Sequence, residues 1–472
     1  MNQKRIVACL AGLLTVMVTV SASVSSRPNI LWIYAEDQSP LMSCYGVQNN
    51  PTPVIDQLAT DGVMFSQAFM PAPVCSATRS ALITGAMPTT FGLHNHRSSR
   101  TPDSMIALPV GVKTVPEIFK EAGYFTFNVG KDDYNFQYDR KNLYDGGSSG
   151  GFANGLKGQK VDWKARKGDQ PFFGQIQIQG GKSKAKIAPI NRALVTIPPY
   201  YPDHPEIRKI WARHHDTARI MDRETGSIIK RLKADGLLEN TIVFVFSDHG
   251  WNNGLRDKQF CYDGGLHVPL VITWYGNPDA IQAGKPRTDM VNGIDIPVTS
   301  LALAGLPIPD YMEGLNLFAP EYKRDYIIGV RDRCDFTIDR IRTVRTEDFR
   351  YVRNFMTDRP YMQSQYRDGR PYTKLLKQLY ADGAMNEQQA WFFADTRPAE
   401  ELYDLQTDPH QTINVAARPE YADALKAHRT ILKDWIEATD DQGQYPESIA
   451  GLTATKARWK DKCVNPEYRA IP

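Results

Sequence analysis

Residues Asn29–Ala35, which read NILWIYA, decide the fold class of this chain. Apolar side chains stand on both faces of this run, as is typical of a strand covered on both sides in a parallel sheet. Further strands are expected at residues 124–129, 172–179, 241–247 and 268–273. Helical stretches lie between them, including residues 116–122 and 205–237. This alternation predicts an α/β fold with a mostly parallel sheet between two layers of helices.

The pattern changes near residue 341. Residues 341–345 and 349–353 alternate in type around a short polar connection, which indicates a hairpin, and residues 422–439 form an amphipathic helix. At 472 residues the chain exceeds what one hydrophobic core usually fills. We therefore expect a catalytic domain over residues 27–340 and a smaller domain of antiparallel sheet and helix over residues 341–472.

The first residues have the pattern of a secretory signal. Lys4 and Arg5 precede an apolar run at residues 6–20, and Val20-Ser21-Ala22 offers small residues for cleavage. The run is shorter than the roughly 20 residues that span a bilayer. We expect residues 1–22 to be a signal peptide and the protein to be exported to a periplasm or secreted, without a membrane anchor. A retained anchor is the alternative.

Five cysteines follow this signal, and four of them can pair if Cys75 is modified: Cys44, Cys261, Cys334 and Cys463. Four cysteines permit three connectivities, and the sequence does not choose among them. Such a sparse framework is secondary to the hydrophobic core in a protein of this size.

The net charge of +3 is nearly neutral and favours no class of partner. Residues 157–192 nevertheless contain nine Lys or Arg against two acids. A solvated lysine-rich loop is the ordinary interpretation, although such a stretch can steer a polyanion toward the protein. Basic and aromatic residues are not interleaved in it, so we expect no nucleic-acid partner.

Polar side chains follow two of the expected strands. Glu36 and Asp37 come directly after the first, and Asp248 and His249 follow the strand that ends at Ser247. Ligands in open α/β sheets bind outside the carboxyl ends of the strands. Three carboxylates and an imidazole that converge there would suit a hard divalent cation.

Residues 75–85 read CSATRSALITG and fit the pattern C-x-[PA]-x-R-x-x-L-x-T-G. A buried cysteine before a helix is the ordinary alternative, since free Cys behaves as a small hydrophobe. The segment resembles the one in which type I sulfatases have a cysteine oxidised to formylglycine. The hydrate of that aldehyde offers a hydroxyl that attacks the sulfur of a sulfate ester, and it expels sulfate when the carbonyl re-forms.

Further segments carry the same resemblance: RPNIL at 27–31 running into Glu36-Asp37, SDHG at 247–250, YDGGLHVP at 262–269, and ELYDL at 401–405 with Asp408-Pro409. They extend from residue 27 to the C-terminal region. The resemblance implies the alkaline-phosphatase-like fold, one Ca²⁺ per chain, formylglycine at Cys75 and a maturation enzyme as partner. In style the chain is similar to bacterial polysaccharide sulfatases.

The resemblance also implies roles for single residues. The metal ligands would be Glu36, Asp37, Asp248, His249 and modified Cys75. Arg79 would stabilise the hydrate with its fork of donors. Lys131 and Lys258 match the two lysines that grip the sulfate.

Two positions depart from the family pattern. Asp133 stands where a histidine commonly follows the first lysine, and Lys182 stands near the place of a second histidine. Lys182 would grip the sulfate or protonate the leaving oxygen, so the general acid is left open. His94, His96 and Arg97 closely follow the Cys75 segment, and contact with substrate and a structural role are both open for them. Asp133 is also expected to contact substrate.

The leading hypothesis is an exported sulfatase that acts on a sulfated carbohydrate, with carrageenan-type and heparan-type glycans as two guesses. A phosphate mono- or diester hydrolase of the same superfamily is one alternative. A non-catalytic protein that binds sulfated glycans is another, and it would keep Cys75 as a thiol.

Overall fold

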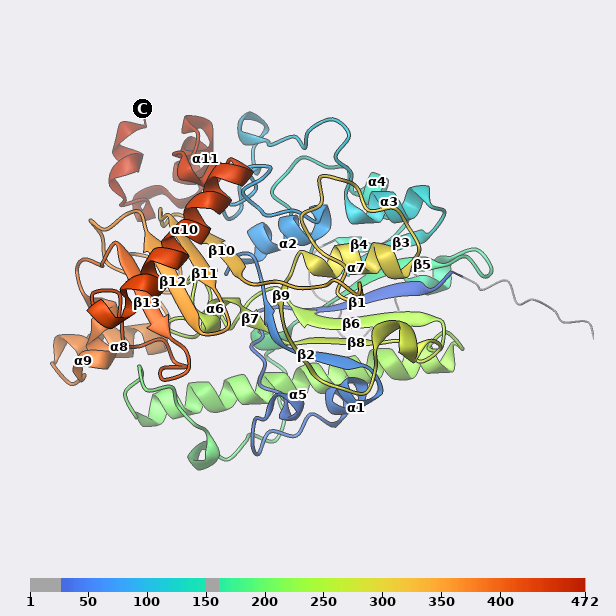
Figure 1. The fold of residues 1–472 in the computed structure, drawn as a ribbon, viewed down its shortest axis with the longest axis horizontal. Coiled ribbons are helices and arrows are strands. Elements are labelled where there is room, and N and C mark those ends of the chain that lie inside the picture. The colour runs from blue at the N-terminus through green and yellow to red at the C-terminus, as the bar shows by residue number, and fades with distance from the viewer. Residues whose placement is uncertain (1–26, 150–160, 472) are drawn as a thin grey trace, which may run out of the picture.

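The computed structural model describes residues 27–149 and 161–471 (Figure 1). The expected signal peptide at residues 1–22 lies outside the described residues, as do Lys157 and Lys160 of the basic stretch. None of the helices in the described part of the chain combines the length and the apolar character needed to cross a membrane.

The main sheet has nine strands in the order β4-β3-β5-β1-β6-β8-β2-β7, with β9 paired to β2. The strands are β1 (Asn29–Ala35), β2 (Val63–Phe69), β3 (Phe125–Gly130), β4 (Gly146–Ser149), β5 (Phe172–Ile178), β6 (Thr241–Ser247), β7 (His267–Val268), β8 (Leu270–Thr273) and β9 (Arg287–Asn292). From β4 to β6 all neighbours are parallel, whereas β8 runs antiparallel to β6 and to β2. The prediction of a mostly parallel sheet is confirmed.

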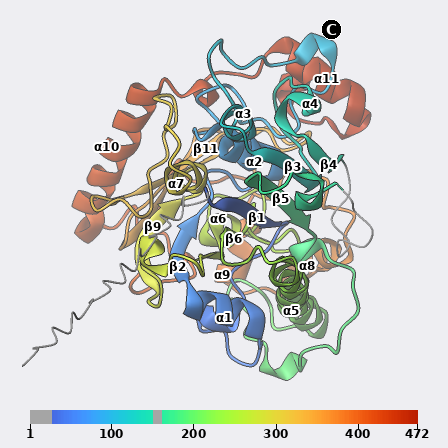
Figure 2. The same cartoon turned by 90° about the vertical axis from the view of Figure 1, so that its right-hand side faces the viewer.

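Strand β1 lies at the centre and separates two hydrophobic cores. Ile30, Trp32 and Tyr34 face one core, and Leu31, Ile33 and Ala35 face the other. Helices α2 (Cys75–Thr84), α3 (Val115–Glu121) and α7 (Asp295–Leu303) cover one face of the sheet, and α1 (Pro53–Asp61) and α5 (Pro205–Ala234) cover the other (Figures 1 and 2). The strand is apolar on both faces because each face meets a layer of helices.

The expected strand at residues 268–273 is divided in two. Its residues belong to β7 and β8, and Pro269 lies between them. Proline has no backbone N–H and cannot continue a ladder of hydrogen bonds. β7 consequently pairs with the end of β2, while β8 continues beside β6.

A second, antiparallel sheet occupies the C-terminal region in the order β10-β11-β12-β13. Its strands are β10 (Ile327–Arg331), β11 (Ile341–Arg345), β12 (Phe349–Asn354) and β13 (Glu400–Asp404). The expected hairpin is β11 and β12, and the expected helix is α10 (Ala422–Thr439), which packs on this sheet (Figure 1). The domain limits stay a prediction, although the sheet takes β10 from before residue 341.

The remaining helices are α4 (Arg140–Leu143), α6 (Asp263–Leu266), α8 (Pro371–Ala381), α9 (Glu387–Ala390) and α11 (Ile449–Trp459). The five cysteines of the described residues are free thiols.

Candidate active site

Three parallel strands end side by side and bring the polar residues together. Ala35, the last residue of β1, pairs with Ile178 of β5 and with Ser247 of β6. Glu36-Asp37 and Asp248-His249 therefore leave the sheet at the same level. This is the edge at which open α/β sheets bind ligands.

The turn after β1 is fixed by close backbone contacts. Asp37 has a left-handed backbone with φ of 53°, and its N–H donates to Asp248 Oδ1 at 2.9 Å. Gly181 donates its N–H to the carbonyl of Glu36 at 2.8 Å. A Cβ on Gly181 would lie 1.9 Å from the carbonyl oxygen of Asp37, so only glycine fits there.

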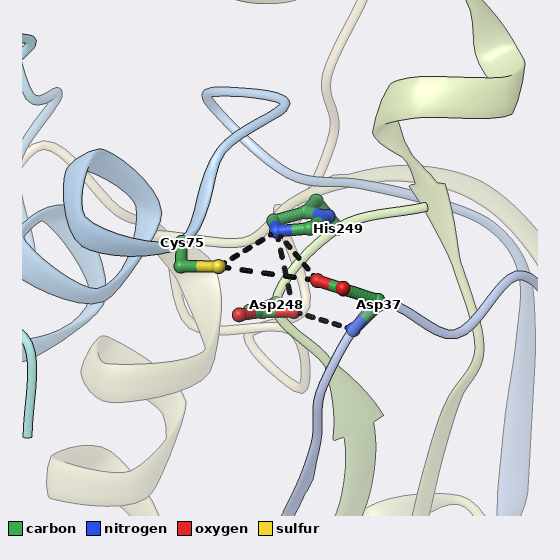
Figure 3. A group of neighbouring side chains, drawn as sticks. All are labelled: Asp37, Cys75, Asp248 and His249. Carbon is green, nitrogen blue, oxygen red and sulfur yellow. Dashed lines mark hydrogen bonds and ion pairs between the residues drawn. The ribbon is translucent and has the colours of Figure 1, made fainter. Parts of the chain in front are cut away.

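Cys75 is the first residue of α2, a helix whose residues are all buried. Its Sγ lies 3.2 Å from His249 Nε2, 3.1 Å from Lys258 Nζ and 3.9 Å from Asp37 Oδ1. Figure 3 shows the thiol directed at the carboxylates and imidazole that come from the ends of β1 and β6. The structure thus joins the Cys75 segment to the strand-end cluster.

Four of the five expected metal ligands form one compact group. Ligand atoms of Asp37, Cys75, Asp248 and His249 all lie within 4.8 Å of one another (Figure 3). Asp248 Oδ2 is buried without a hydrogen-bond partner in the described residues. The two carboxylates fit a hard divalent cation such as Ca²⁺, whose preferred ligands are oxygens, and the imidazole of His249 lies beside them.

Glu36 lies beside this group and faces cations. Its carboxylate pairs with the Arg79 guanidinium and with the ammonium of Lys182, and it accepts from Lys131 Nζ at 3.0 Å. These cations hold the pKa of Glu36 well below its ordinary value although burial raises it. Its role as a metal ligand stays a prediction.

Arg79 lies on α2 one turn after Cys75 and is 1% exposed. Its Nη1 donates to Gln177 Oε1 at 2.8 Å, and its Nε lies 3.4 Å from Asp248 Oδ2. The guanidinium also lies over the Tyr34 ring, 4.3 Å from the ring centroid. These contacts fix the guanidinium beside the carboxylates.

The three expected lysines surround Cys75. Lys182 Nζ lies 3.7 Å from the sulfur, and Lys258 Nζ lies 3.1 Å from Asp37 Oδ1. Burial and Glu36 raise the pKa of the Cys75 thiol, but Lys131, Lys182 and Lys258 outweigh them and lower it below its usual value. The site therefore favours an anion at the position of the sulfur.

The residues expected to meet substrate are divided between two places. His96 contacts Ser76 Oγ through Nδ1 at 2.8 Å, and Asp133 lies 2.9 Å from Lys131 Nζ, so both border the Cys75 cluster. Arg97, which is 36% exposed, donates its backbone N–H to Ser76 Oγ at 2.8 Å. His94 instead lines a separate cavity of about 160 Å³ beside the C-terminal segment. The structure does not bring His94 to the cluster.

Sequence reasoning missed two polar partners of the site. Gln177 holds Arg79, and Asn252 Nδ2 donates to Asp37 Oδ2. Gln177 could have been found from the sequence, because it is a polar residue within an expected buried strand and a buried amide requires a hydrogen-bond partner. Asn252 lies in an irregular segment after His249 and gave no such signal.

A family model described as Sulfatase matches residues 28–306. A second, described as N-sulphoglucosamine sulphohydrolase, C-terminal, matches residues 248–390. The first match covers more than half of the chain, so the chain belongs to the sulfatase family. By class it is a sulfuric ester hydrolase of the alkaline-phosphatase-like superfamily.

Individual proteins are also similar to this chain in sequence or in fold. An ulvan-active sulfatase of Formosa agariphila is 29% identical over 478 residues, which covers 89% of this chain and 77% of that protein. One protein of known structure, solved with its substrate D-glucosamine-2-N,6-O-disulfate, has 18% sequence identity to this chain and a TM-score of 0.63. The match covers 88% of this chain and 98% of that protein. A phosphonate monoester hydrolase of Agrobacterium radiobacter is 19% identical with a TM-score of 0.61, covering 88% and 96%. These structural likenesses establish the fold.

Proposed function

We propose that this protein is an exported sulfatase that releases inorganic sulfate from a sulfated carbohydrate, with Cys75 converted to formylglycine. The observation that carries the proposal is the position of the Cys75 sulfur, 3.1 Å from Lys258 Nζ and 3.2 Å from His249 Nε2 at the strand ends. A formylglycine at this position would supply a hydrated aldehyde whose hydroxyl is a nucleophile toward sulfur. Asp37, Asp248, His249 and the modified Cys75 would hold a Ca²⁺ that withdraws charge from a sulfate oxygen.

The chain's own residues bind and orient the sulfate group. Lys131, Lys182 and Lys258 present ammonium groups around the position of the Cys75 sulfur. Charge grows on sulfate oxygens as the ester bond breaks, and preorganised cations stabilise that charge in a site that excludes water. Arg79 keeps its orientation through Gln177 and Tyr34, so it requires little rearrangement during the reaction.

Lys182 suits sulfate binding better than proton donation. Its Nζ lies 3.7 Å from the Cys75 sulfur and pairs with the carboxylates of Glu36 and Asp37, so it is placed to hold an anion at the position of the sulfur. A lysine ammonium ordinarily has a pKa of about 10.4, which makes it a poor proton donor near neutral pH. The role of Lys182 is then to grip the sulfate, in place of the family's histidine.

A carbohydrate substrate is supported by the relatives. The Formosa agariphila protein is named for its activity on ulvan, and one protein of the same fold was solved with a sulfated glucosamine. The signal pattern at residues 1–22 supports export, which would give access to such glycans and to no nucleic acid. A maturation enzyme that oxidises Cys75 would be the protein partner.

A phosphate ester hydrolase is the second candidate, because a phosphonate monoester hydrolase has the same fold. Phosphoryl and sulfuryl groups share their tetrahedral shape. The rates of hydrolysis distinguish the two candidate functions. A sulfatase should hydrolyse sulfated oligosaccharides faster than phosphate mono- or diesters.

The test combines mass spectrometry with product analysis on protein made together with its maturation enzyme. The peptide that contains Cys75 should lose mass by the exchange of sulfur for oxygen and the removal of two hydrogens. Ion chromatography should detect inorganic sulfate when defined sulfated oligosaccharides are added. An unmodified thiol in protein that binds glycans without turnover would favour the non-catalytic alternative. Faster hydrolysis of a phosphodiester would favour the second candidate.

A further inference from the structure

We propose that Arg97 and Arg100 form a second anion-binding subsite beside the Cys75 cluster, which recognises another acidic group, a carboxylate or a second sulfate, on the sulfated carbohydrate. This inference rests on the proposed function and specifies its substrate class. It would restrict the enzyme to glycans that carry a second acidic group near the sulfate ester.

The two arginines are only partly neutralised. Arg97 Nη1 lies 3.2 Å from Asp335 Oδ1, and Arg100 Nη2 donates to Asp133 Oδ1 at 2.6 Å. Each guanidinium uses a single nitrogen in its ion pair to a carboxylate, and their side chains are 36% and 33% exposed. The guanidinium nitrogens outside these ion pairs belong to the planar fork that suits bidentate binding of a carboxylate or sulfate.

Asp133 connects this pair to the sulfate-gripping lysine. Its Oδ2 lies 2.9 Å from Lys131 Nζ, while its Oδ1 accepts from Arg100. Lys131, Arg100 and Arg97 lower the pKa of Asp133 to about 2 against the effect of burial. The Asp133 carboxylate therefore bridges Lys131 and Arg100 through its two oxygens. Two ion pairs, Arg100–Asp133 and Asp133–Lys131, thus link the subsite to a lysine that contacts Glu36 beside Cys75.

The backbone of this rim is held in an unusual conformation. Arg97, Ser99, Asp133 and Asp335 have φ of 57°, 55°, 60° and 51°, in the left-handed region. Strained residues persist where surrounding contacts over-determine them, and they gather at functional sites.

Specific hydrogen bonds provide those contacts. Ser76 Oγ accepts the N–H of Arg97 at 2.8 Å, and the Ser99 hydroxyl donates to the Asn135 carbonyl at 2.8 Å. The N–H of His96 donates to the Arg333 carbonyl at 2.9 Å. Because Ser76 follows Cys75 on α2, the same helix positions the nucleophile and the rim.

Positive charge also dominates the hollow behind the rim. The hollow lies between this loop and α11, and its charged lining residues are Arg97, Arg100, Arg333, Arg458 and Asp335. Arg333 is paired with Glu447, 2.8 Å from its Nη2, but Arg458 is exposed and lies over the Trp459 ring. Three of these four arginines are paired, with Asp335, Asp133 and Glu447, so one net positive charge is left at the hollow, which favours the second acidic group of a substrate.

The experiment compares enzyme variants and substrate variants in pairs. The substrate is the sulfated oligosaccharide that the formylglycine-containing enzyme hydrolyses fastest, in three forms: intact, with its carboxylates reduced to alcohols, and with only the scissile sulfate retained. Arg97→Gln and Arg100→Gln are the test variants, and Arg97→Lys and Arg100→Lys restore the charge. Arg208→Gln is the matched control, because Arg208 is 32% exposed and is also paired with an aspartate, at the start of α5.

We expect each Gln variant to lower kcat/KM on the intact oligosaccharide by about tenfold, mainly through KM, as for loss of a charged hydrogen bond. This loss in kcat/KM should be at least severalfold smaller on the form of the substrate that lacks the recognised acidic group. If that form is the one with reduced carboxylates, the subsite binds a carboxylate; if it is the one with only the scissile sulfate retained, the subsite binds a second sulfate. The Lys variants should recover part of the loss, and Arg208→Gln should show no such difference between substrates.

Equal losses on all three forms, or losses in kcat alone, would overturn the subsite. Calorimetric binding of the same three oligosaccharides gives the comparison without turnover, and unfolding curves identify any variant that fails to fold. Absence of sulfate release by the unmutated enzyme would count against the proposed function instead. In that case the binding comparison still decides the subsite.

Discussion

Two clusters of buried charge in this protein both contain arginines and carboxylates but pair them differently. Under the small sheet, Arg342 and Arg397 each hold one carboxylate through two nitrogens, beside single contacts of Arg342 with Asp332 and of Arg331 with Asp339. Arg342 donates to Asp441 from Nε at 2.6 Å and from Nη2 at 3.0 Å. Arg397 pairs with Asp339 at 3.0 and 2.5 Å, and both side chains are 0% exposed. Such matched pairs fix one geometry.

Around Cys75 the charges are shared. Arg79, Lys131 and Lys182 all contact Glu36, and Asp37 lies within 3.1 Å of both Lys258 Nζ and His249 Nε2. Sharing leaves lone pairs and ammonium protons that a sulfate or a cation can engage. Burial and charge therefore do not by themselves mark the functional cluster, and the pattern of pairing does.

The largest expected effect follows from Cys75→Ala. This change removes the proposed nucleophile and should reduce sulfate release by more than about 10³-fold, as for catalytic nucleophiles in other enzymes. Stability should change little, because the shared cluster keeps its other contacts. Turnover and unfolding curves measure the two effects. Cys44→Ala is the control, since Cys44 is half-buried away from the site, and substantial turnover by Cys75→Ala would contradict the mechanism.

Arg342→Met should lower stability and leave turnover largely unchanged, the reverse of what is expected for Cys75→Ala. It leaves Asp441 and Asp332 buried beside an apolar side chain, which should cost about 3–5 kcal/mol of unfolding free energy. Sulfate release per folded molecule should persist. Arg429→Met is the control, since this arginine is 52% exposed in its pair with Glu400 and should cost less than about 1 kcal/mol. An unaltered denaturation midpoint for Arg342→Met would show that the matched pairs do not hold the fold.

Calcium should stabilise the shared cluster selectively. A cation that binds only the folded state adds about 2.7 kcal/mol at one hundred times its Kd. The thermal midpoint should therefore fall when a chelator is added and recover with Ca²⁺, and turnover should follow. Asp248→Asn should weaken this dependence, whereas Arg342→Met should retain it. Equal midpoints with chelator and with Ca²⁺ would rule out a cation at this site.

Glu224 on α5 is a buried carboxyl group that belongs to neither cluster. Its substitution should have the smallest of the expected effects. Burial raises the pKa of Glu224 from 4.5 to about 7 against the opposing charge of Arg223. Between these values the folded state holds a proton that the unfolded chain has released, so stability falls as pH rises. We expect Glu224→Gln to remove about 1–3 kcal/mol of this decline between pH 4.5 and 7. Urea denaturation across this range measures it, and a slope equal to that of the unmutated protein would refute the assignment.

Local patterns predicted the elements that depend least on distant partners. The bounds of β1, β6 and α10 are those expected, because their apolar spacing reports directly which faces are buried. The residues that meet at the strand ends were also predictable, since parallel strands deliver their carboxyl ends to one edge. The Cys75 segment is contiguous, so its cysteine and arginine needed no tertiary information.

The sequence alone thus determined the fold class, the Cys75 segment and most of the cluster around it. Tertiary structure decided the antiparallel position of β8 beside β6, the place of β10 in the small sheet, and the separation of His94 from His96. It also decided that Asn252 reaches Asp37 and that Arg97 meets Asp335. These contacts join segments far apart in the chain, and their free energy comes from packing and burial in three dimensions, which no local residue preference encodes.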